Sequence, residues 1–155
     1  MWRATARRQM RWALPCAALL CLVALALTGC GVAVAGRASA QTAGRVVKVT
    51  EHDFKISAPA QLGTGRVTLR VHNAGPDIHE LLVARVGGGA PLPLRLDGLT
   101  VDEDRIQAAT LGNLEPGAPG VTRDLTVDLT PGRYVLFCNM YGHYRGGMHM
   151  QLVVN

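Results

Sequence analysis

The chain has 155 residues, a formal net charge of +5, and a composition that is 48% hydrophobic but only 5% aromatic. This length allows one domain of ordinary size. Five of the 16 basic residues lie within residues 1–40, which contain no acid, so the other 11 balance the 11 acidic residues of positions 41–155. A domain of balanced charge lacks the basic surface that nucleic-acid binding requires, so we expect no nucleic-acid partner.

The N-terminal segment has the pattern of an export signal. Residues 1–11 hold four arginines and no acid, and residues 13–27 are almost uninterrupted apolar sequence. An apolar stretch of about fifteen residues is too short for a membrane-spanning helix, which needs about twenty. Following a basic segment, it is typical of a secretory signal. We therefore expect residues 1–40 to be a leader and tether, and residues 41–155 to be one exported domain.

Two processing sites compete at the end of this leader. Residues 27–30 (Leu-Thr-Gly-Cys) resemble the bacterial lipobox, in which the cysteine becomes lipid-modified and N-terminal. Residues 38–40 (Ala-Ser-Ala) instead fit ordinary signal peptidase, with Gln41 as the new N-terminus. The lipobox is favoured because it directly follows the apolar run. It predicts a lipidated Cys30, which would hold the domain at the outer face of the cytoplasmic membrane or in the periplasm, with no other membrane contact.

Of the four cysteines, Cys138 alone belongs to the expected domain, because Cys16, Cys21 and Cys30 lie in the leader. An exported domain with a single thiol has no disulfide framework. The unpaired thiol therefore predicts another role for Cys138.

Strand patterns dominate the expected domain. Short runs of aliphatic and β-branched residues alternate with polar residues and are separated by turns that contain Gly or Pro. The clearest alternation is at residues 65–73, where Val67, Leu69 and Val71 share one face. The expected strands are residues 46–49, 65–73, 78–86, 124–129, 134–138 and 148–154. Such a series predicts an all-β fold, an antiparallel sandwich or barrel.

Residues 87–121 differ from the rest of the domain. They hold three consecutive glycines, four prolines and an acidic cluster. Thr100-x-x-Glu103 resembles a capping box, so we expect a short helix over residues 101–109. Long connections are usually functional or mobile, but a solvated excursion without a role is an equal alternative.

The residues that can carry chemistry are concentrated near the C-terminus. Cys138, His143 and Met148 stand in one short segment with the spacing Cys-x4-His-x4-Met. Pleating places Cys138 at the end of one inward-facing row and His79 at the start of another, directly after a turn. Singly, a buried Cys, a core Met or a strand-end His needs no ligand role. Together they match the blue-copper geometry of one Cys and two His with a long axial Met, and they predict one copper ion that cycles between Cu(I) and Cu(II).

Residues 46–154 resemble the cupredoxins, small blue-copper proteins, and are most similar to the plastocyanin, azurin and auracyanin-like members. The most specific matching piece is the loop Cys138-x4-His143-Tyr144-x-x-Gly147-Met148, which leads to Leu152-x-Val154. The other matching pieces are Asp53-Phe54-Lys55-Ile56, Asn73-x-Gly75-x-x-x-His79-Glu80-Leu81, and Pro131-Gly132-x-Tyr134-x-x-x-Cys138.

The resemblance implies a Greek-key β-sandwich in which His79, Cys138 and His143 are equatorial copper ligands and Met148 is the axial ligand. In plastocyanins and azurins an Asn follows the first His and helps to tie the two ligand loops together. Glu80 stands at that place here, so the resemblance does not supply this tether. Two further histidines, His72 and His149, alternate with core-facing residues and are expected to face solvent, and His52 is given no role.

The resemblance also implies a docking surface for redox partners. In cupredoxins the C-terminal His ligand lies near the surface within an apolar patch, where such partners bind transiently. Met140, Tyr141 and Tyr144 flank His143 and are expected to form this patch. The expected protein is a monomer that carries single electrons between redox partners.

Two other functions are weighed against electron transfer. A copper enzyme would join the blue site to a second copper centre through His residues beside the Cys, but Phe137 and Asn139 flank Cys138, so we expect no enzyme. A copper carrier or buffer that delivers the metal to an oxidase would use the same soft ligands. It is kept as the alternative, because nearby donors occur at Met140, His149 and Met150.

Overall fold

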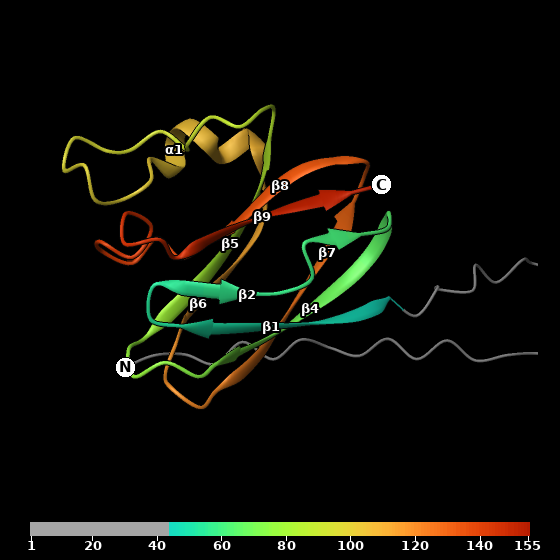
Figure 1. Ribbon diagram of the computed structural model, residues 1–155, viewed down its shortest axis with the longest axis horizontal. Coiled ribbons are helices and arrows are strands. Elements are labelled where there is room, and N and C mark those ends of the chain that lie inside the picture. The colour runs from blue at the N-terminus through green and yellow to red at the C-terminus, as the bar shows by residue number, and fades with distance from the viewer. Residues whose placement is uncertain (1–43) are drawn as a thin grey trace, which may run out of the picture. The chain divides into compact units, whose positions relative to one another are not determined.

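The computed structural model describes residues 44–155, in which nine strands form two sheets (Figure 1). The first sheet has the strand order β2-β1-β4-β7, with β1 at Arg45–His52, β2 at Lys55–Ser57, β4 at Gly65–Asn73 and β7 at Thr122–Leu129. The second has the order β3-β9-β8-β5-β6, with β3 at Gln61–Leu62, β9 at His149–Val154, β8 at Gly132–Phe137, β5 at His79–Val86 and β6 at Thr110–Gly117. The chain passes repeatedly from one sheet to the other, which confirms the predicted all-β sandwich. Within residues 44–155, no helix has the length and apolar character needed to cross a membrane.

Alternating side chains build the core between the two sheets. In β4, Val67, Leu69 and Val71 are buried while the residues between them face outwards. In the other sheet, Tyr134 and Leu136 of β8 point into the same core. Each fully buried Val or Leu contributes about 1.5–3 kcal/mol relative to an exposed one. The period-2 pattern of the sequence is therefore the pattern of burial.

The predicted strand 65–73 has the observed bounds, and the other predicted strands are present with at least one end shifted, by at most three residues. The antiparallel prediction is wrong in part, because β1 pairs with β4 in parallel and β3 pairs with β9 in parallel. β6 is a strand that the sequence did not predict. Its sequence contains Gly, Asn and Pro, which are depleted in strands. It becomes a strand through its antiparallel pairing with β5.

The segment 87–109 covers the outer face of the five-stranded sheet. Within it, α1 (Glu103–Ile106) continues into a 3-10 turn at Gln107–Ala109. The segment packs on β5, β8 and the loop after β8 in a second hydrophobic cluster, formed by Leu82, Ala84, Leu92, Val101, Ile106, Val135, Phe137 and Tyr144. β5 and β8 are therefore buried on both faces. Of the two alternatives for this segment, the solvated excursion is wrong.

The helix in this segment is shorter than predicted and is capped by a different residue. Asp102, not Thr100, is the N-cap, and its side chain accepts a hydrogen bond from the Arg105 backbone N–H. The Thr100 hydroxyl instead donates to Asp97 at 2.7 Å, within the preceding turn. The capping-box assignment fails because Thr100 already belongs to that turn.

Candidate metal centre

The loop 138–148, which joins β8 to β9, is folded back on itself by its own backbone. The Cys138 N–H donates to the Met148 carbonyl at 3.1 Å, and the Met148 N–H donates to the His143 carbonyl at 2.9 Å. Gly142 and Gly147 have φ angles of +81° and +105°, which a residue with a side chain rarely adopts. These reversals bring the two ends of the loop together, so that Cys138, His143 and Met148 lie at one end of the sandwich.

His79, the first residue of β5, reaches the same place from the neighbouring strand. Its Nδ1 lies 3.3 Å from Nδ1 of His143, which in turn lies 3.4 Å from Sγ of Cys138. The three donor atoms all lie within 4.8 Å of one another. His79 and Cys138 are fully buried, whereas His143 is half-buried.

These distances fit the coordination of one metal ion. With metal–nitrogen bonds of about 2.0–2.1 Å and a metal–sulfur bond of about 2.3 Å, a trigonal centre separates its nitrogens by about 3.5 Å and its sulfur from each nitrogen by about 3.8 Å. The observed separations are a few tenths of an ångström shorter. Among residues 44–155, this is the one group of three His, Cys, Asp or Glu side chains arranged to hold a metal.

Met148 lies beside this group. It is fully buried and belongs to the core cluster, and its backbone is hydrogen-bonded to both Cys138 and His143. Met140 and Met150 are only partly buried against the same cluster. The expectation that Met148, and not Met140 or Met150, is the axial ligand is therefore compatible with these positions.

Burial controls the ionisation of the donors. Loss of water around Cys138 raises the pKa of its thiol to about 11, although hydrogen bonding from the backbone of Glu80 and Met140 partly offsets this. Burial also lowers the pKa of His79. Burial thus favours the neutral imidazole, the form that could act as a metal ligand, and metal binding at Cys138 would require loss of its thiol proton.

Two side chains tie the ligand loops to each other and to the covering segment. Burial raises the pKa of Glu80 to about 7, and hydrogen bonding from the backbone of Asn139 opposes this rise. Glu80 therefore connects β5, which begins with His79, to the loop that carries Cys138. The Asn139 side chain in turn accepts a hydrogen bond from the Val101 N–H and donates to Glu103 at 2.7 Å. The segment 87–109 thus supports the loop that carries Cys138.

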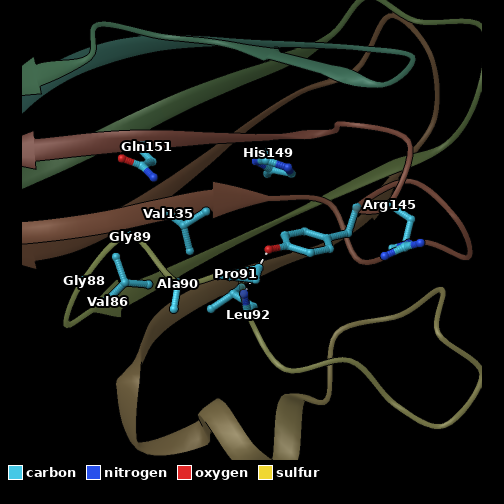
Figure 2. A pocket seen from close by; sticks show the side chains of 11 residues that line it. Val86, Gly88, Gly89, Ala90, Pro91, Leu92, Val135, Arg145, His149 and Gln151 are labelled. Carbon is cyan, nitrogen blue, oxygen red and sulfur yellow. Dashed lines mark hydrogen bonds between the residues drawn. The ribbon is translucent and has the colours of Figure 1, made fainter.

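The remaining histidines behave as the alternation predicts. His72 is exposed and hydrogen-bonded to Thr122 at 3.1 Å. His149 is exposed and stacks on Tyr144 with ring centroids 4.8 Å apart. Tyr144 is buried on the side away from the metal ligands, where its hydroxyl accepts a hydrogen bond from the Leu92 N–H at 3.0 Å. A pocket of about 310 Å³ lies there, with Leu92 and His149 among its lining residues (Figure 2).

No role was predicted for the turn between β1 and β2, although its residues contact both histidines of the candidate metal centre. Asp53 lies 3.0 Å from Nε2 of His79, and the ring of Phe54 packs edge-on against that of His143 with centroids 5.5 Å apart. The available signal was the Asp-Phe pair itself, which belongs to one of the pieces that resemble cupredoxins.

Comparison with solved structures identifies the fold. Neither a family model nor a curated protein matches this chain. Among solved structures, a reduced auracyanin from Roseiflexus castenholzii aligns with a TM-score of 0.54 at 18% identity, over 72% of this chain and 98% of its own. Auracyanin A from Chloroflexus aurantiacus, described as a "blue" copper protein, aligns with a TM-score of 0.53 at 17% identity, over 71% of this chain and 98% of its own.

Rusticyanin from Thiobacillus ferrooxidans gives a similar result. It aligns with a TM-score of 0.51 at 14% identity, over 72% of this chain and 79% of its own. At such identities the similarity concerns the architecture. The chain has the cupredoxin fold, as its sequence predicted.

Proposed function

We propose that this protein is a type 1 copper protein that carries single electrons between redox partners. The observation that carries the proposal is the meeting of one Cys Sγ and two His Nδ1 atoms within 4.8 Å of one another, at the end of a cupredoxin sandwich. One soft sulfur, two imidazoles and an adjacent thioether suit copper better than a hard cation. A bound copper ion would supply one-electron chemistry by cycling between Cu(I) and Cu(II).

The chain's own part is to keep this geometry unchanged. His79 begins β5 and Cys138 directly follows β8. Both side chains are fully buried and both strands are packed on both faces, so the donor atoms have little freedom to move. Backbone hydrogen bonds of the loop 138–148 hold His143 and Met148 to the same frame. A site that does not rearrange between oxidation states makes electron transfer fast. The hydrophobic surroundings of the Cys138 sulfur would tune the reduction potential.

The proposal includes a docking surface at the exposed edge of His143. Tyr141 is 72% exposed there. Phe54, which packs on His143, and Ile78, which precedes His79 in the chain, are about half exposed. Tyr144, which the sequence assigned to this patch, is buried elsewhere and does not belong to it. Transient redox encounters use small interfaces, so a few exposed apolar side chains around a monomer are sufficient.

Copper delivery, the alternative, receives less support. A carrier site benefits from further donors that pass the metal on, but His149 stacks on Tyr144, and Met140 and Met150 pack against the core. These three potential donors therefore already make packing contacts within the protein, which does not favour a role in passing copper on.

We expect the copper-loaded, oxidised protein to be intensely blue or green. The colour would arise from charge transfer between the Cys138 thiolate and Cu(II), and its measurement is a visible absorption spectrum with an electron paramagnetic resonance spectrum. A colourless protein with a wide copper hyperfine splitting would instead indicate an ordinary copper site and defeat the electron-transfer proposal.

Replacement of Met148 tests the axial ligand. Met148→Leu would leave the site without an axial donor. This loss should destabilise Cu(II) more than Cu(I), so the reduction potential should rise, while the equatorial ligands keep the blue colour. Met148→Gln should lower the potential, because it offers a harder oxygen. Met140→Leu is the matched control and should leave the spectrum and potential nearly unchanged. The assignment is wrong if Met140→Leu changes both while Met148→Leu changes neither.

We further propose that the protein is exported and anchored to the outer face of the cytoplasmic membrane through lipidated Cys30. This residue and the whole leader lie outside the described residues, and the support is the lipobox at the end of the apolar run. Bacterial lipoproteins carry two or three acyl chains, which suffices for stable anchoring. Mass spectrometry of the native N-terminus should find an acylated Cys30. An unmodified Gln41 terminus would mean cleavage after Ala40 and a freely diffusing carrier.

A further inference from the structure

The two-residue turn between β1 and β2 contacts both histidines of the candidate metal centre. The Asp53 carboxylate reaches Nε2 of His79 at 3.0 Å, and the Phe54 ring packs on the ring of His143. Phe54 has a φ angle of +60°, in the left-handed region that a bulky residue rarely occupies. Strained backbone of this kind persists where the surrounding structure holds it, and it concentrates at functional sites.

The contact with Asp53 fixes which nitrogen of His79 is free. An ionised carboxylate can only accept hydrogen bonds, so Nε2 of His79 must carry the hydrogen that it donates to Asp53. The other nitrogen, Nδ1, then keeps its lone pair. That nitrogen lies 3.3 Å from Nδ1 of His143, on the side where a metal would bind.

Glycine opposite the turn makes this close approach feasible. A Cβ at Gly75 would lie 2.6 Å from Oδ1 of Asp53 and 2.7 Å from Nε2 of His79, so any side chain there would push the pair apart. Gly75 is held in place by hydrogen bonds from its own N–H to Asn73 at 2.9 Å and from the Ala74 N–H to the Glu51 carbonyl at 2.8 Å. On the other side of the turn, a Cβ at Gly146 would collide with the Phe54 ring. The absence of a side chain at Gly75 and at Gly146 therefore permits both contacts.

We propose that Asp53 is a positioning residue of the metal centre: its carboxylate holds His79 in the tautomer that presents Nδ1 to the metal, and its negative charge favours the more highly charged state of that metal. The inference rests on the proposed function. Carboxylate partners of this kind orient metal-bound histidines and increase their basicity, and losing them typically costs about 10–100-fold in metal affinity. Asp53 is 22% exposed on its side chain while His79 is fully buried, so the charge acts through a largely dry contact.

Two substitutions at Asp53 separate its hydrogen bond from its charge. Asp53→Ala removes both, whereas Asp53→Asn keeps an oxygen that can accept from Nε2 and removes the charge. Asp77→Asn is the matched control, because Asp77 is an exposed neighbouring carboxylate that contributes to the field at His79 without contacting it. Each protein would be checked for folding by its far-ultraviolet circular dichroism.

Nitrogen-15 NMR of the purified, metal-free protein reads the tautomer directly. Wild type, Asp53→Asn and Asp77→Asn should all show His79 protonated at Nε2, while Asp53→Ala should show a mixture of tautomers. Affinity for Co²⁺ should fall about 10–100-fold in Asp53→Ala and change little in Asp77→Asn. Neither readout requires copper or electron transfer, so the positioning role can hold even if the proposed function fails.

The reduction potential of the copper-loaded protein tests the charge. It should rise in both Asp53 variants and rise less in Asp77→Asn. An Asp53→Ala protein with the wild-type tautomer and Co²⁺ affinity would overturn the positioning role. An Asp53→Asn potential no higher than that of Asp77→Asn would overturn the electrostatic role, and this comparison still decides if Asp53→Ala does not fold.

Discussion

Replacing Cys138 by serine is expected to abolish the intense visible absorption of the copper-loaded protein while leaving the sandwich folded. Sγ of Cys138 is the one sulfur in the group of three donor atoms, and the colour depends on its thiolate. A serine hydroxyl stays protonated at neutral pH and is a harder donor, so it cannot supply the same charge transfer. Visible absorption of the variant, loaded with copper under wild-type conditions, is the measurement.

The fold should survive this change at moderate cost. Cys138 is fully buried, and a serine hydroxyl left without a partner in its place costs about 1–3 kcal/mol. Thermal unfolding of the metal-free variant measures that loss. Met140→Leu is the matched control, because it removes a sulfur that packs against the same core and should leave the absorption unchanged. If the band persisted in Cys138→Ser, the chromophore would have to lie elsewhere in the protein.

The sandwich could be predicted because its signal is local. In β4 a strict alternation of apolar and polar residues coincides with burial of Val67, Leu69 and Val71, and a register error would turn that whole row to solvent. The Gly- and Pro-containing turns fixed the ends of the strands to within a few residues. Burial of one face leaves such a pattern in any sequence.

Pairing partners leave no local signal, and this is where prediction failed. β6 contains a Pro and two Gly, and only its contact with β5 makes it a strand. The parallel pairing of β1 with β4 likewise depends on two segments that meet across the fold. The second hydrophobic cluster, between β5 and the segment 87–109, was missed for a related reason. Leu82 and Ala84 alternate with Leu81 and Val83, so an entirely apolar run hides the fact that both faces are covered.

The residues of the candidate site likewise fall into those that the sequence reveals and those that only the fold brings together. Cys138, His143 and Met148 could be grouped from the sequence because one short loop carries them, and His79 could be added because it begins a core-facing row. Asp53 could not be assigned, since it lies 26 positions from His79 in the chain and meets it only in three dimensions. Asn139, which contacts Val101 across 38 positions, was missed for the same reason.

Replacing Arg123 by methionine is expected to lower the free energy of unfolding by about 3–5 kcal/mol. Arg123 donates to Glu51 at 2.8 Å and also to the Glu115 carbonyl, and the Glu51 side chain is fully buried. Within residues 44–155, Oε1 of Glu51 is buried without any hydrogen-bond partner. Methionine fills similar volume but leaves this carboxylate with no compensating charge, so the loss comes from an unpaired ion and not from a cavity.

The pH dependence identifies that cause. Burial raises the pKa of Glu51 above its usual value of 4.5, and Arg123 opposes the rise. Without Arg123 the pKa should rise further. A carboxyl with a raised pKa in the folded state binds its proton more tightly there than in the unfolded chain, so its favourable contribution is full below about 4.5 and is lost as the pH rises through the folded pKa. Denaturant unfolding should therefore find that Arg123→Met recovers stability as the pH falls from 7 towards 5.

Two further variants complete this test. Arg66→Met breaks the exposed pair with Asp128, whose side chains are 58% and 68% exposed, and should cost no more than about 1 kcal/mol. Glu51→Gln added to Arg123→Met should restore much of the loss, because it removes the stranded charge. If Arg123→Met cost no more than Arg66→Met, Glu51 could not be an ionised group in a dry site. The backbone carbonyl of Glu51 also accepts a hydrogen bond from the Ala74 N–H, in the loop before His79. Arg123 therefore stabilises β1 at a residue that also contacts the loop leading to the candidate metal centre.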